Sequence, residues 1–462
     1  MTATTTHSLL QLARTLTLSV GAIAAVSTVG ATAGCEGEGE GEGEGEGEGE
    51  GEGEGEGEGE EDVVADLTAA GFVVEDVGPA EDGAGLYELT FAMPNDYTNP
   101  NGGTHEHHLS LVHRGYAEPM HLVSTGYGNY LGHDELALTT LLQSNQLVLD
   151  KRLHNGNGDF ADFSRAQVNA DIHEVIDRLD AFYTNGFIHT GLSNGGTDVV
   201  SFQRVHADDL VGSMTFGTPF ITANDDRFPG FFETVDSACQ ARLQAIQVAV
   251  LTRRATVETL VLAPFLADGY TRIASDAAFE AAALSYPWLF WQYEGSAEDC
   301  AALPDPATAT DVELADAFGY TVSVFGAFPM SDAYLLFFGA YFFEIQRDGG
   351  WPQLPRAALE AGSLIRADLI DMEFGVVPEG VAPPVFGADE NAALRNAAAA
   401  SDDIIFVYSA SDPWSIGKIT LDANSISDVY VSTTSNHTAD ITELSEADQA
   451  ALMATVAGWL GE

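Results

Sequence analysis

Apolar and polar residues follow one another along this chain in patterns that predict strands alternating with helices. Short apolar runs bounded by turn residues predict strands at residues 86–93, 106–114, 145–150, 403–409 and 428–434. A further apolar run, residues 120–128, ends in a glycine-rich loop. Apolar residues at helical spacing predict helices at 134–144, 165–184 and 443–460. This alternation favours a mostly parallel sheet with helices on both faces.

A long segment between residues 228 and 395 interrupts the alternation with helical patterns that are rich in aromatic side chains. Strand patterns return after it. A parallel sheet that is interrupted by a helical block and then resumed is typical of the α/β-hydrolase fold with a helical cap. We therefore expect an α/β protein whose hydrolase core consists of residues 62–227 and 396–462, with the cap at residues 228–395.

The first 35 residues have the features of an export signal. A short polar region with Arg14 precedes the apolar run LTLSVGAIAAVSTVGA, and small residues lead to Cys35. These residues resemble a lipoprotein cleavage box, in which the cysteine receives the lipid, although Thr32 stands where that box usually has Leu. The alternatives are an ordinary secretory signal and an uncleaved membrane helix, for which the run is barely long enough.

Residues 36–61 alternate almost entirely between Glu and Gly. Such a segment has no apolar surface to bury and repels itself, so we expect it to be extended and disordered. Behind a lipidated Cys35 it would be a tether between the cell envelope and the folded part. The alternative is a low-complexity expansion without a role. Without the lipid, the exported protein would be periplasmic or extracellular.

Cysteine usage agrees with export. The chain has three cysteines, and assigning Cys35 to the lipid leaves Cys239 and Cys300 as an even pair. Such a pair in an exported chain predicts a disulfide, and two free buried thiols are the alternative.

The chain is strongly acidic, with a formal net charge of −54 and only two lysines, Lys151 and Lys418. Fourteen of the carboxylates lie between Glu36 and Glu61, so the remainder keeps about −40. A surface of this sign repels nucleic acids and anionic lipids, so we expect neither as a partner and any membrane contact to be through the lipid alone. Scarce lysine among many carboxylates also suggests a surface suited to high salt.

The stretch FIHTGLSNGG places Ser193 in a G-x-S-x-G motif. An apolar run precedes it and a helical pattern, GGTDVVSFQRVH, follows. In an α/β-hydrolase the nucleophilic serine lies on a tight turn between a strand and a helix, where flanking glycines relieve crowding. The context therefore favours Ser193 as a nucleophile over the alternative of a plain glycine turn.

A serine nucleophile needs an imidazole to take its proton and a carboxylate to orient that imidazole. The α/β-hydrolase order is Ser, Asp, His, with the last two on loops after late strands. Asp412 follows the predicted strand at 403–409, and His437 follows the one at 428–434. We therefore predict a triad of Ser193, Asp412 and His437; solvated loop residues are the alternative.

Backbone amides should stabilise the oxyanion. One donor is expected from Asn194, the residue after the nucleophile, and the other from the TGYG loop at 125–128, with Tyr127 as the candidate. The alternative for this loop is a glycine turn without a catalytic role.

We expect no metal and no other cofactor. His105, His107 and His108 cluster on one predicted strand, but alternation puts His107 and His108 on opposite faces. Glycine loops with the spacing of a P-loop or a dinucleotide-binding motif are absent from the sequence.

Six stretches in order, PMHLVSTGYG, DELALTTLLQSNQLVLDKR, FIHTGLSNGG, FWQYEGSAEDC, FVYSASDPW and SNHTADI, resemble the secreted bacterial serine tripeptidyl aminopeptidase family. The similarity extends over about residues 85–445. Those enzymes are α/β-hydrolases with a helical cap, related to the lysosomal Pro-X carboxypeptidase and dipeptidyl-peptidase II group. The chain departs from the family at Asn194, where Lys is usual, at Thr197, where Met is usual, and at residues 150–152, where the family has EHR.

The resemblance implies that Ser193, Asp412 and His437 form the triad and that Cys239 and Cys300 form a cap disulfide. An aminopeptidase must also recognise a free amine, which calls for a carboxylate near the nucleophile. Glu135 resembles the family's acidic residue in the helix after the oxyanion loop and is the candidate; a solvated helix residue is the alternative.

The sequence therefore predicts an exported, membrane-tethered serine exopeptidase that removes short peptides from free amino termini through an acyl-enzyme. A carboxylic-ester hydrolase would use the same triad without an amine-binding carboxylate. A catalytically inactive surface-binding protein would retain the fold but have no chemical reason to keep all three triad residues.

Overall fold

The computed structural model of the protein describes residues 62–154, 159–323, 326–366 and 376–461. The predicted export signal, Cys35 and the Glu-Gly tether lie outside these residues. None of the described helices combines the length and the apolar character needed to cross a membrane.

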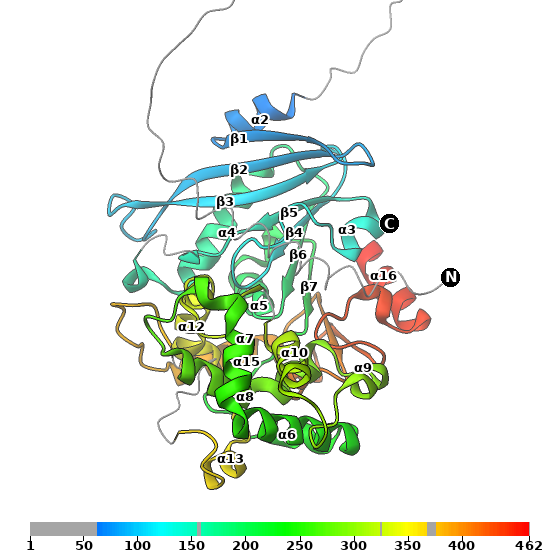
Figure 1. Cartoon of the computed structure of the whole chain (residues 1–462). Coiled ribbons are helices and arrows are strands. Elements are labelled where there is room, and N and C mark those ends of the chain that lie inside the picture. The colour runs from blue at the N-terminus through cyan, green and yellow to red at the C-terminus, as the bar shows by residue number, and fades with distance from the viewer. Residues whose placement is uncertain (1–61, 155–158, 324–325, 367–375, 462) are drawn as a thin grey trace, which may run out of the picture.

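A single twisted sheet organises the described part of the chain (Figure 1). Its strand order is β1-β2-β3-β5-β4-β6-β7-β8-β9. The strands from β5 to β9 are parallel to one another, while β1, β2 and β3 form antiparallel pairs that end on β5. The bounds are β1 Val73–Pro79, β2 Gly85–Pro94, β3 Thr104–His113, β4 Met120–Ser124, β5 Asn145–Leu149, β6 Phe187–Leu192, β7 Gly212–Phe216, β8 Ile404–Ser409 and β9 Asp428–Ser432.

Helices cover both faces of the parallel strands, which are largely buried, and β8 is apolar on both faces. Along β8, Ile404 and Phe406 pack with the helices on one face, and Ile405 and Val407 pack with those on the other. The helices outside the long helical segment are α2 Val63–Ala69, α3 Ala137–Leu142, α4 Arg165–Leu179, α5 Gly195–His206, α15 Ala388–Ala399 and α16 Glu446–Trp459. Short 3-10 turns lie at Phe160–Asp162, Ala207–Asp209, Pro413–Gly417 and Ile441–Glu443.

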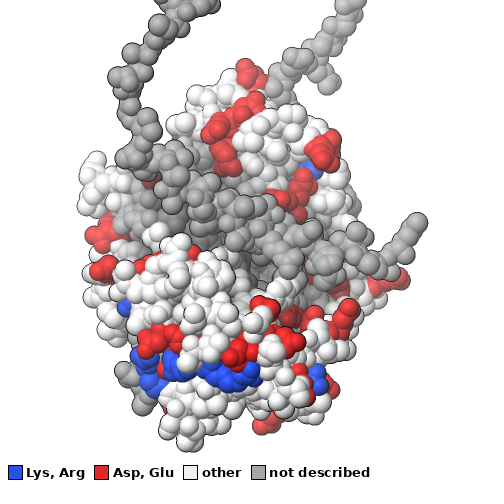
Figure 2. All heavy atoms as spheres, viewed as in Figure 1, with Lys and Arg blue, Asp and Glu red and all other residues white. Residues whose placement is uncertain are grey.

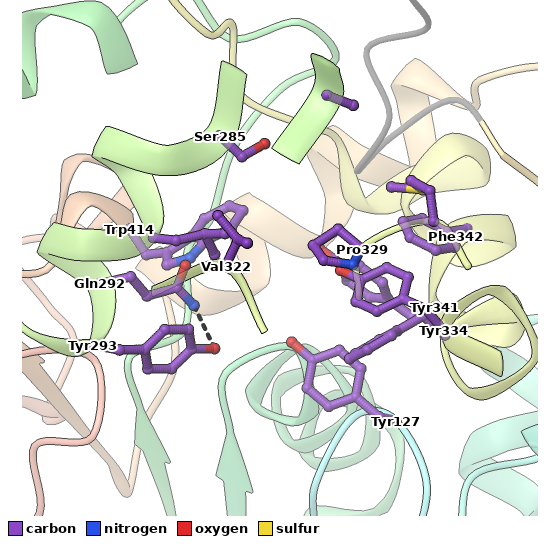
Figure 3. Close-up of a pocket in the computed structure, with 14 residues that line it drawn as sticks. Tyr127, Ser285, Gln292, Tyr293, Val322, Pro329, Tyr334, Tyr341, Phe342 and Trp414 are labelled. Carbon is purple, nitrogen blue, oxygen red and sulfur yellow. Dashed lines mark hydrogen bonds between the residues drawn. The ribbon is translucent and has the colours of Figure 1, made fainter. Parts of the chain in front are cut away.

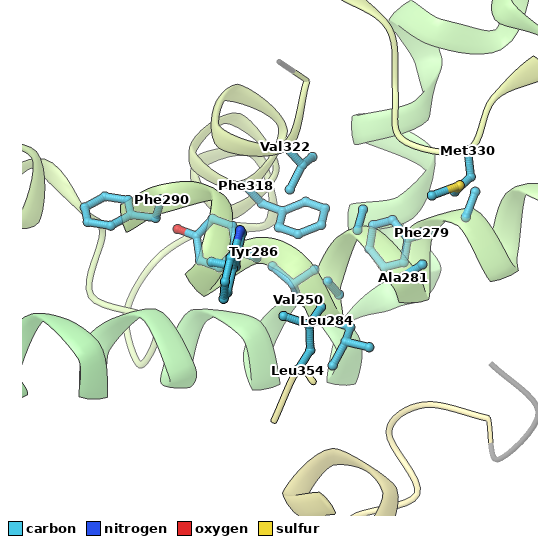
Figure 4. Close-up of a cluster of buried hydrophobic side chains, with 14 of the residues drawn as sticks. Val250, Phe279, Ala281, Leu284, Tyr286, Phe290, Phe318, Val322, Met330 and Leu354 are labelled. Carbon is cyan, nitrogen blue, oxygen red and sulfur yellow. The ribbon is translucent and has the colours of Figure 1, made fainter. Parts of the chain in front are cut away.

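The segment between β7 and α15, here called the helical block, has its own core. Figure 4 shows apolar side chains of α6, α8 and α10 meeting in it. Helix α8 is buried nearly all round, which places it at the centre of the block. The block contains α6 Ser237–Thr252, α7 Arg254–Leu262, α8 Ser275–Tyr293, α9 Ala297–Ala302, α10 Asp311–Val322, α11 Asp332–Phe337, α12 Gly339–Glu344 and α13 Ala357–Ala361, with 3-10 turns at Phe228–Glu233 and Ala263–Asp268 and a π turn at Ile345–Gly349.

A disulfide joins Cys239 of α6 to Cys300 of α9, with their Cα atoms 5.5 Å apart. It closes a loop of the helical block that includes all of α7 and α8. A disulfide is stable in an oxidising compartment, so this bond fits an exported protein.

The surface is acidic, as the composition predicts. Figure 2 shows carboxylates spread over the visible face, whereas most of the visible basic side chains gather in a band low in the view and a few lie elsewhere.

Most predicted elements are present, but α4 ends at Leu179, before its predicted end at residue 184, and α2 was not predicted. Helix α3 is shorter than predicted because Leu136 is still extended, its amide donating to Gln146 Oε1, and because Gln143 adopts a left-handed φ of 51°. Strands β1 and β7 were not predicted. β1 is an edge strand interrupted by charged residues, Gly and Pro, and β7 has too few apolar residues to stand out, since Ser213 and Thr215 are buried in it.

Candidate active site

Ser193 lies on a tight turn between β6 and α5. Its φ of 51° is in the left-handed region, which a side-chain-bearing residue adopts only under constraint. The flanking glycines are required by contact: a Cβ on Gly191 would lie 2.4 Å from the amide nitrogen of Gly196, and one on Gly195 would lie 2.0 Å from the carbonyl oxygen of Ser124. The G-x-S-x-G motif is therefore the sequence of a strained turn that presents the serine hydroxyl.

The three residues predicted as a triad lie in hydrogen-bonding contact. His437 Nε2 is 3.0 Å from Ser193 Oγ, and His437 Nδ1 is 2.8 Å from Asp412 Oδ2. Because Nδ1 faces a carboxylate, it carries the imidazole proton and leaves Nε2 free to accept from the serine hydroxyl. The arrangement can therefore withdraw a proton from Ser193.

Two loops hold the acid and the base. Asp412 follows β8, is fully buried, and its Oδ1 accepts from the backbone amide of Trp414 at 3.0 Å. The His437 loop is tied to the end of α8: the amide of His437 donates to the carbonyl of Gln292 at 2.9 Å, and Asn436 Nδ2 donates to the carbonyl of Tyr293 at 2.7 Å. The helical block thus positions the base.

Tyr127 follows β4 and meets the nucleophile through its side chain. Its phenol oxygen is 3.1 Å from Ser193 Oγ, while its backbone nitrogen lies 3.4 Å from Thr125 Oγ1 within its own loop. Gly126 has φ of 83°, and a Cβ there would lie 2.2 Å from the amide nitrogen of Gly195. The loop therefore packs closely against the turn that carries Ser193, without room for a side chain at residue 126.

A cluster of buried charges lies behind the nucleophile. Glu344, at the end of α12, is fully buried; it contacts Lys151 Nζ at 2.5 Å and Arg165 Nη1 at 3.0 Å. Its Oε2 also accepts from the side-chain amide of Asn194 at 2.9 Å. Asp198 and Asp348 complete the cluster, at 3.0 Å from Lys151 and 2.7 Å from Arg165. Asn194 is thus held by a carboxylate of the helical block.

The charge state of Glu344 follows from its partners. Burial opposes ionisation of the carboxyl group, but Lys151 and Arg165 outweigh it and hold its pKa below the usual value. Glu344 is therefore a carboxylate whose charge is already compensated. It is not free to bind a substrate amine.

Replacing Glu344 with Gln should destabilise the fold. The change preserves shape but leaves buried Lys151 and Arg165 short of one negative partner, so we expect the free energy of unfolding to fall by about 3 kcal/mol. Unfolding by denaturant measures this loss of unfolding free energy. Glu360→Gln, which removes the partly exposed pair with Arg356, should cost less than about 1 kcal/mol. Equal losses in the two variants would contradict the role of the buried cluster.

A pocket lies between the helical block and Tyr127, whose hydroxyl contacts Ser193 (Figure 3). It encloses about 710 Å³ of empty space, part of which is open to solvent. Tyr293 and Trp414 lie on one side, with Tyr127, Tyr334 and Tyr341 across from them. Among the described residues its lining contains no charged side chain, and the aromatic members are Tyr127, Tyr293, Tyr334, Phe338, Tyr341, Phe342 and Trp414.

Glu135 lies far from this pocket. Its carboxylate pairs with Arg114 Nη2 at 2.8 Å, and Arg114 Nη1 donates to the carbonyl of Ser144, just before β5 begins. Ser193 follows the opposite, carboxyl end of the parallel strands. The prediction that Glu135 binds the substrate amine is therefore wrong, because a residue near the start of α3 is on the wrong edge of the sheet.

The histidines offer little for a metal. His105 and His107 are buried with their rings in edge contact, and His108 points to the other, exposed face. A second group, His173, His206 and Asp209, brings three potential ligand atoms within 4.8 Å of one another. The two imidazoles stack with ring centroids 4.3 Å apart, and His173 Nδ1 contacts Asp209 Oδ2 at 2.7 Å.

Sequence reasoning missed the pocket and the charge cluster. The aromatic pattern of residues 332–342 is visible in the sequence, yet nothing in it shows that these side chains face Ser193. Lys151 was noticed only as one of two lysines. The rarity of lysine was the available signal, because a lone lysine in an acidic chain is a candidate for a specific buried pair.

Comparisons with known proteins agree with this geometry. The sequence profile of the PS-10 peptidase S37 family matches residues 67–462. The chain belongs to the peptidase S37 family. A curated relative, the prolyl tri/tetrapeptidyl aminopeptidase of Streptomyces mobaraensis, is 25% identical over 392 residues, which cover 81% of this chain and 80% of the relative. The chain is therefore a serine hydrolase of a peptidase family, as the resemblance in its motifs implied.

The fold is that of the α/β-hydrolases. Similar solved structures include a putative hydrolase from Bacillus subtilis, with 10% identity over 85% of this chain and 96% of that chain at a TM-score of 0.35. The naproxen esterase from Bacillus subtilis has 10% identity over 85% of this chain and 95% of that chain, at a TM-score of 0.34. These similarities are distant, and the details of the fold come from the strand order and the turn at Ser193.

Proposed function

We propose that this S37 family member is an exported serine aminopeptidase that releases short peptides from free amino termini. The observation that carries the proposal is the contact of Ser193 with His437 and of His437 with Asp412, beside a pocket suited to a peptide. Residues 62–227 and 396–462 would be the catalytic core, and residues 228–395, which include most of the helical block and part of α15, would be its cap.

The chemistry follows from the triad. His437 Nε2 takes the Ser193 proton as Oγ attacks the scissile carbonyl carbon, which gives a tetrahedral oxyanion. His437 then donates that proton to the departing amine as the C–N bond breaks, leaving the amino-terminal peptide as an ester on Ser193. Water attacks this ester with His437 again as base, and the peptide leaves as a carboxylic acid. Asp412 stabilises the imidazolium in both steps.

The pocket supports a preference for an apolar residue on the acyl side of the scissile bond. Its aromatic rings offer flat apolar faces, and the relative from Streptomyces mobaraensis is named as a prolyl peptidase. A proline ring packs well on such faces and has no amide proton that would need an acceptor. We therefore infer that proline occupies the position before the cleaved bond.

Recognition of the free amine would rest on the same rings. An ammonium group is attracted to the faces of Tyr and Trp within about 6 Å of the ring centre. No lysine or arginine among the described residues lines the pocket, so nothing positive there opposes it. The electrostatic field of the acidic chain also attracts an ammonium group.

Peptides with free and acetylated amino termini test the proposal. The substrates are tripeptide amides with proline before the cleaved bond. Acetylation of their amino terminus should lower kcat/KM by about tenfold or more, because it removes the charge that the aromatic rings attract. Mass spectrometry of the products identifies the cleaved bond. Equal cleavage of both forms would refute the aminopeptidase function, and ester turnover without peptide turnover would make a carboxylic-ester hydrolase the better description.

Export is part of the proposal. The Cys239–Cys300 disulfide supports an oxidising compartment. A lipid on Cys35, with residues 36–61 as the tether, would then hold the enzyme at the cell envelope.

A further inference from the structure

The phenol of Tyr127 lies in contact with the reacting hydroxyl. Its oxygen is 3.1 Å from Ser193 Oγ, and the backbone amide of Asn194 also acts on it. The amide after the nucleophile is one of the donors that an α/β-hydrolase aims at the oxyanion. The phenol oxygen therefore lies within hydrogen-bonding distance of the nucleophile and beside the amide that follows it.

The backbone of the same loop is directed elsewhere. The Tyr127 nitrogen lies 3.4 Å from Thr125 Oγ1, so its hydrogen points within the loop and not toward Ser193. Asn194 supplies one amide, and its own side chain is occupied by Glu344 and the carbonyl of Gly126. An oxyanion that received only the Asn194 amide would lack a second donor, which typically contributes about 3 kcal/mol to the transition state.

The phenol is suited to be that donor because it keeps its proton. Burial raises the pKa of Tyr127 to about 12, even though the contacts with Ser193 and the nearby Lys151 act in the opposite direction. A neutral O–H is therefore present throughout the range in which His437 can act as a base.

The ring is also held in place. Phe338 and Tyr341 pack edge-on against it, with ring centroids 5.3 and 5.1 Å away. Figure 3 shows the Tyr127 hydroxyl pointing into the pocket while its ring lies near Tyr334 and Tyr341. A donor fixed by packing costs little reorganisation when the charge develops.

We propose that the phenolic O–H of Tyr127, and not its backbone amide, is the second oxyanion-hole donor of this enzyme. The proposal rests on the proposed acyl-transfer function. When Ser193 Oγ bonds to the carbonyl carbon, the carbonyl oxygen takes up the electron pair of the broken π bond and accepts hydrogen bonds from Tyr127 and from the Asn194 amide. Tyr127 keeps its proton throughout, and the Oγ proton goes to His437.

Tyr127→Phe tests the proposal because it removes the hydroxyl and keeps the ring packing. We expect kcat to fall about 100-fold with KM changed less than about threefold, since the donor acts only on the oxyanion. Tyr430→Phe, a half-buried tyrosine on β9, is the matched control and should leave kcat within about twofold. A kcat for Tyr127→Phe within threefold of the original enzyme, or above it, would overturn the proposal.

A second measurement separates catalysis from packing. A peptide aldehyde forms a tetrahedral adduct with Ser193 and so mimics the oxyanion, whereas the cleaved acid product binds without one. Tyr127→Phe should weaken the aldehyde by the same factor as kcat/KM and leave product affinity unchanged. Equal weakening of both would show a structural effect and overturn the proposal.

The test does not depend on the substrate class. If the enzyme hydrolyses esters and not peptides, the proposed function fails but the Tyr127 measurements can be made on the ester. If Ser193→Ala retains activity, the acyl-transfer mechanism itself fails. Only a catalytically active, Ser193-dependent enzyme that ignores the loss of the Tyr127 hydroxyl contradicts the inference about Tyr127.

Discussion

Replacing Ser193 with alanine should lower kcat on peptide substrates by roughly a million-fold and abolish labelling by a fluorophosphonate probe. The hydroxyl removed is the one that lies 3.0 Å from His437 Nε2, and no other serine hydroxyl is described in contact with that nitrogen. Steady-state progress curves measure kcat, and intact-protein mass spectrometry measures labelling by the probe. A variant that still turned over substrate with less than a thousand-fold loss would exclude Ser193 as the nucleophile.

The fold should not change with this substitution. Alanine keeps the Cβ of Ser193, so the left-handed turn is no more strained than before, and thermal unfolding should be the same within about a degree. Ser213→Ala is a matched control, because Ser213 is buried in the neighbouring strand β7 and its hydroxyl has no partner among the described residues. It should leave activity unaltered. Loss of activity in both variants would point to damage of the sheet.

The core fold was predictable because its signals are local. The run before Ser193 is buried on both faces, as a central parallel strand is, and the glycines around the serine relieve close contacts in the turn. Asp412 and His437 could be predicted for the same reason, since each follows a strand whose end faces the nucleophile. The order of Ser, Asp and His along the chain and their positions after strands were sufficient to predict the triad.

The rest of the site depends on contacts between distant segments, which no local pattern shows. Glu344 reaches Asn194 across 150 residues of sequence, and its burial with Lys151 and Arg165 is what distinguishes it from the many solvated carboxylates. Glu135 has the place in the order of motifs that the resemblance implies for an amine-binding carboxylate. The order did not reveal that Arg114 holds it at the far edge of the sheet.

The helical block positions the base, the ring of Tyr127 and the residue after the nucleophile. It holds the His437 loop through the last turn of α8, the ring of Tyr127 through Phe338 and Tyr341, and the Asn194 side chain through Glu344. The block is therefore more than a cover that excludes water. We expect substitution of Glu344, which does not line the pocket, to alter kcat because Glu344 holds Asn194.

Asp412→Asn should lower kcat by about ten thousand-fold while leaving the fold intact. The Asn oxygen can take over the bond from the Trp414 amide, and its NH₂ group then faces His437 Nδ1. That nitrogen must become an acceptor, so the imidazole proton moves to Nε2, where it blocks transfer from Ser193. Steady-state kinetics on the peptide substrate measures the loss.

Asp440→Asn is the control for this last substitution. Asp440 belongs to the same segment of chain as His437, but its carboxylate only caps the short helix that begins at Ile441, accepting from the Thr442 amide at 2.6 Å. An asparagine caps nearly as well, so activity should stay within about threefold. Both substitutions remove one negative charge near the site. Only Asp412→Asn changes which nitrogen of His437 carries the proton, so the difference between the two variants measures the effect of the tautomer. A loss below tenfold for Asp412→Asn would mean that another group orients His437.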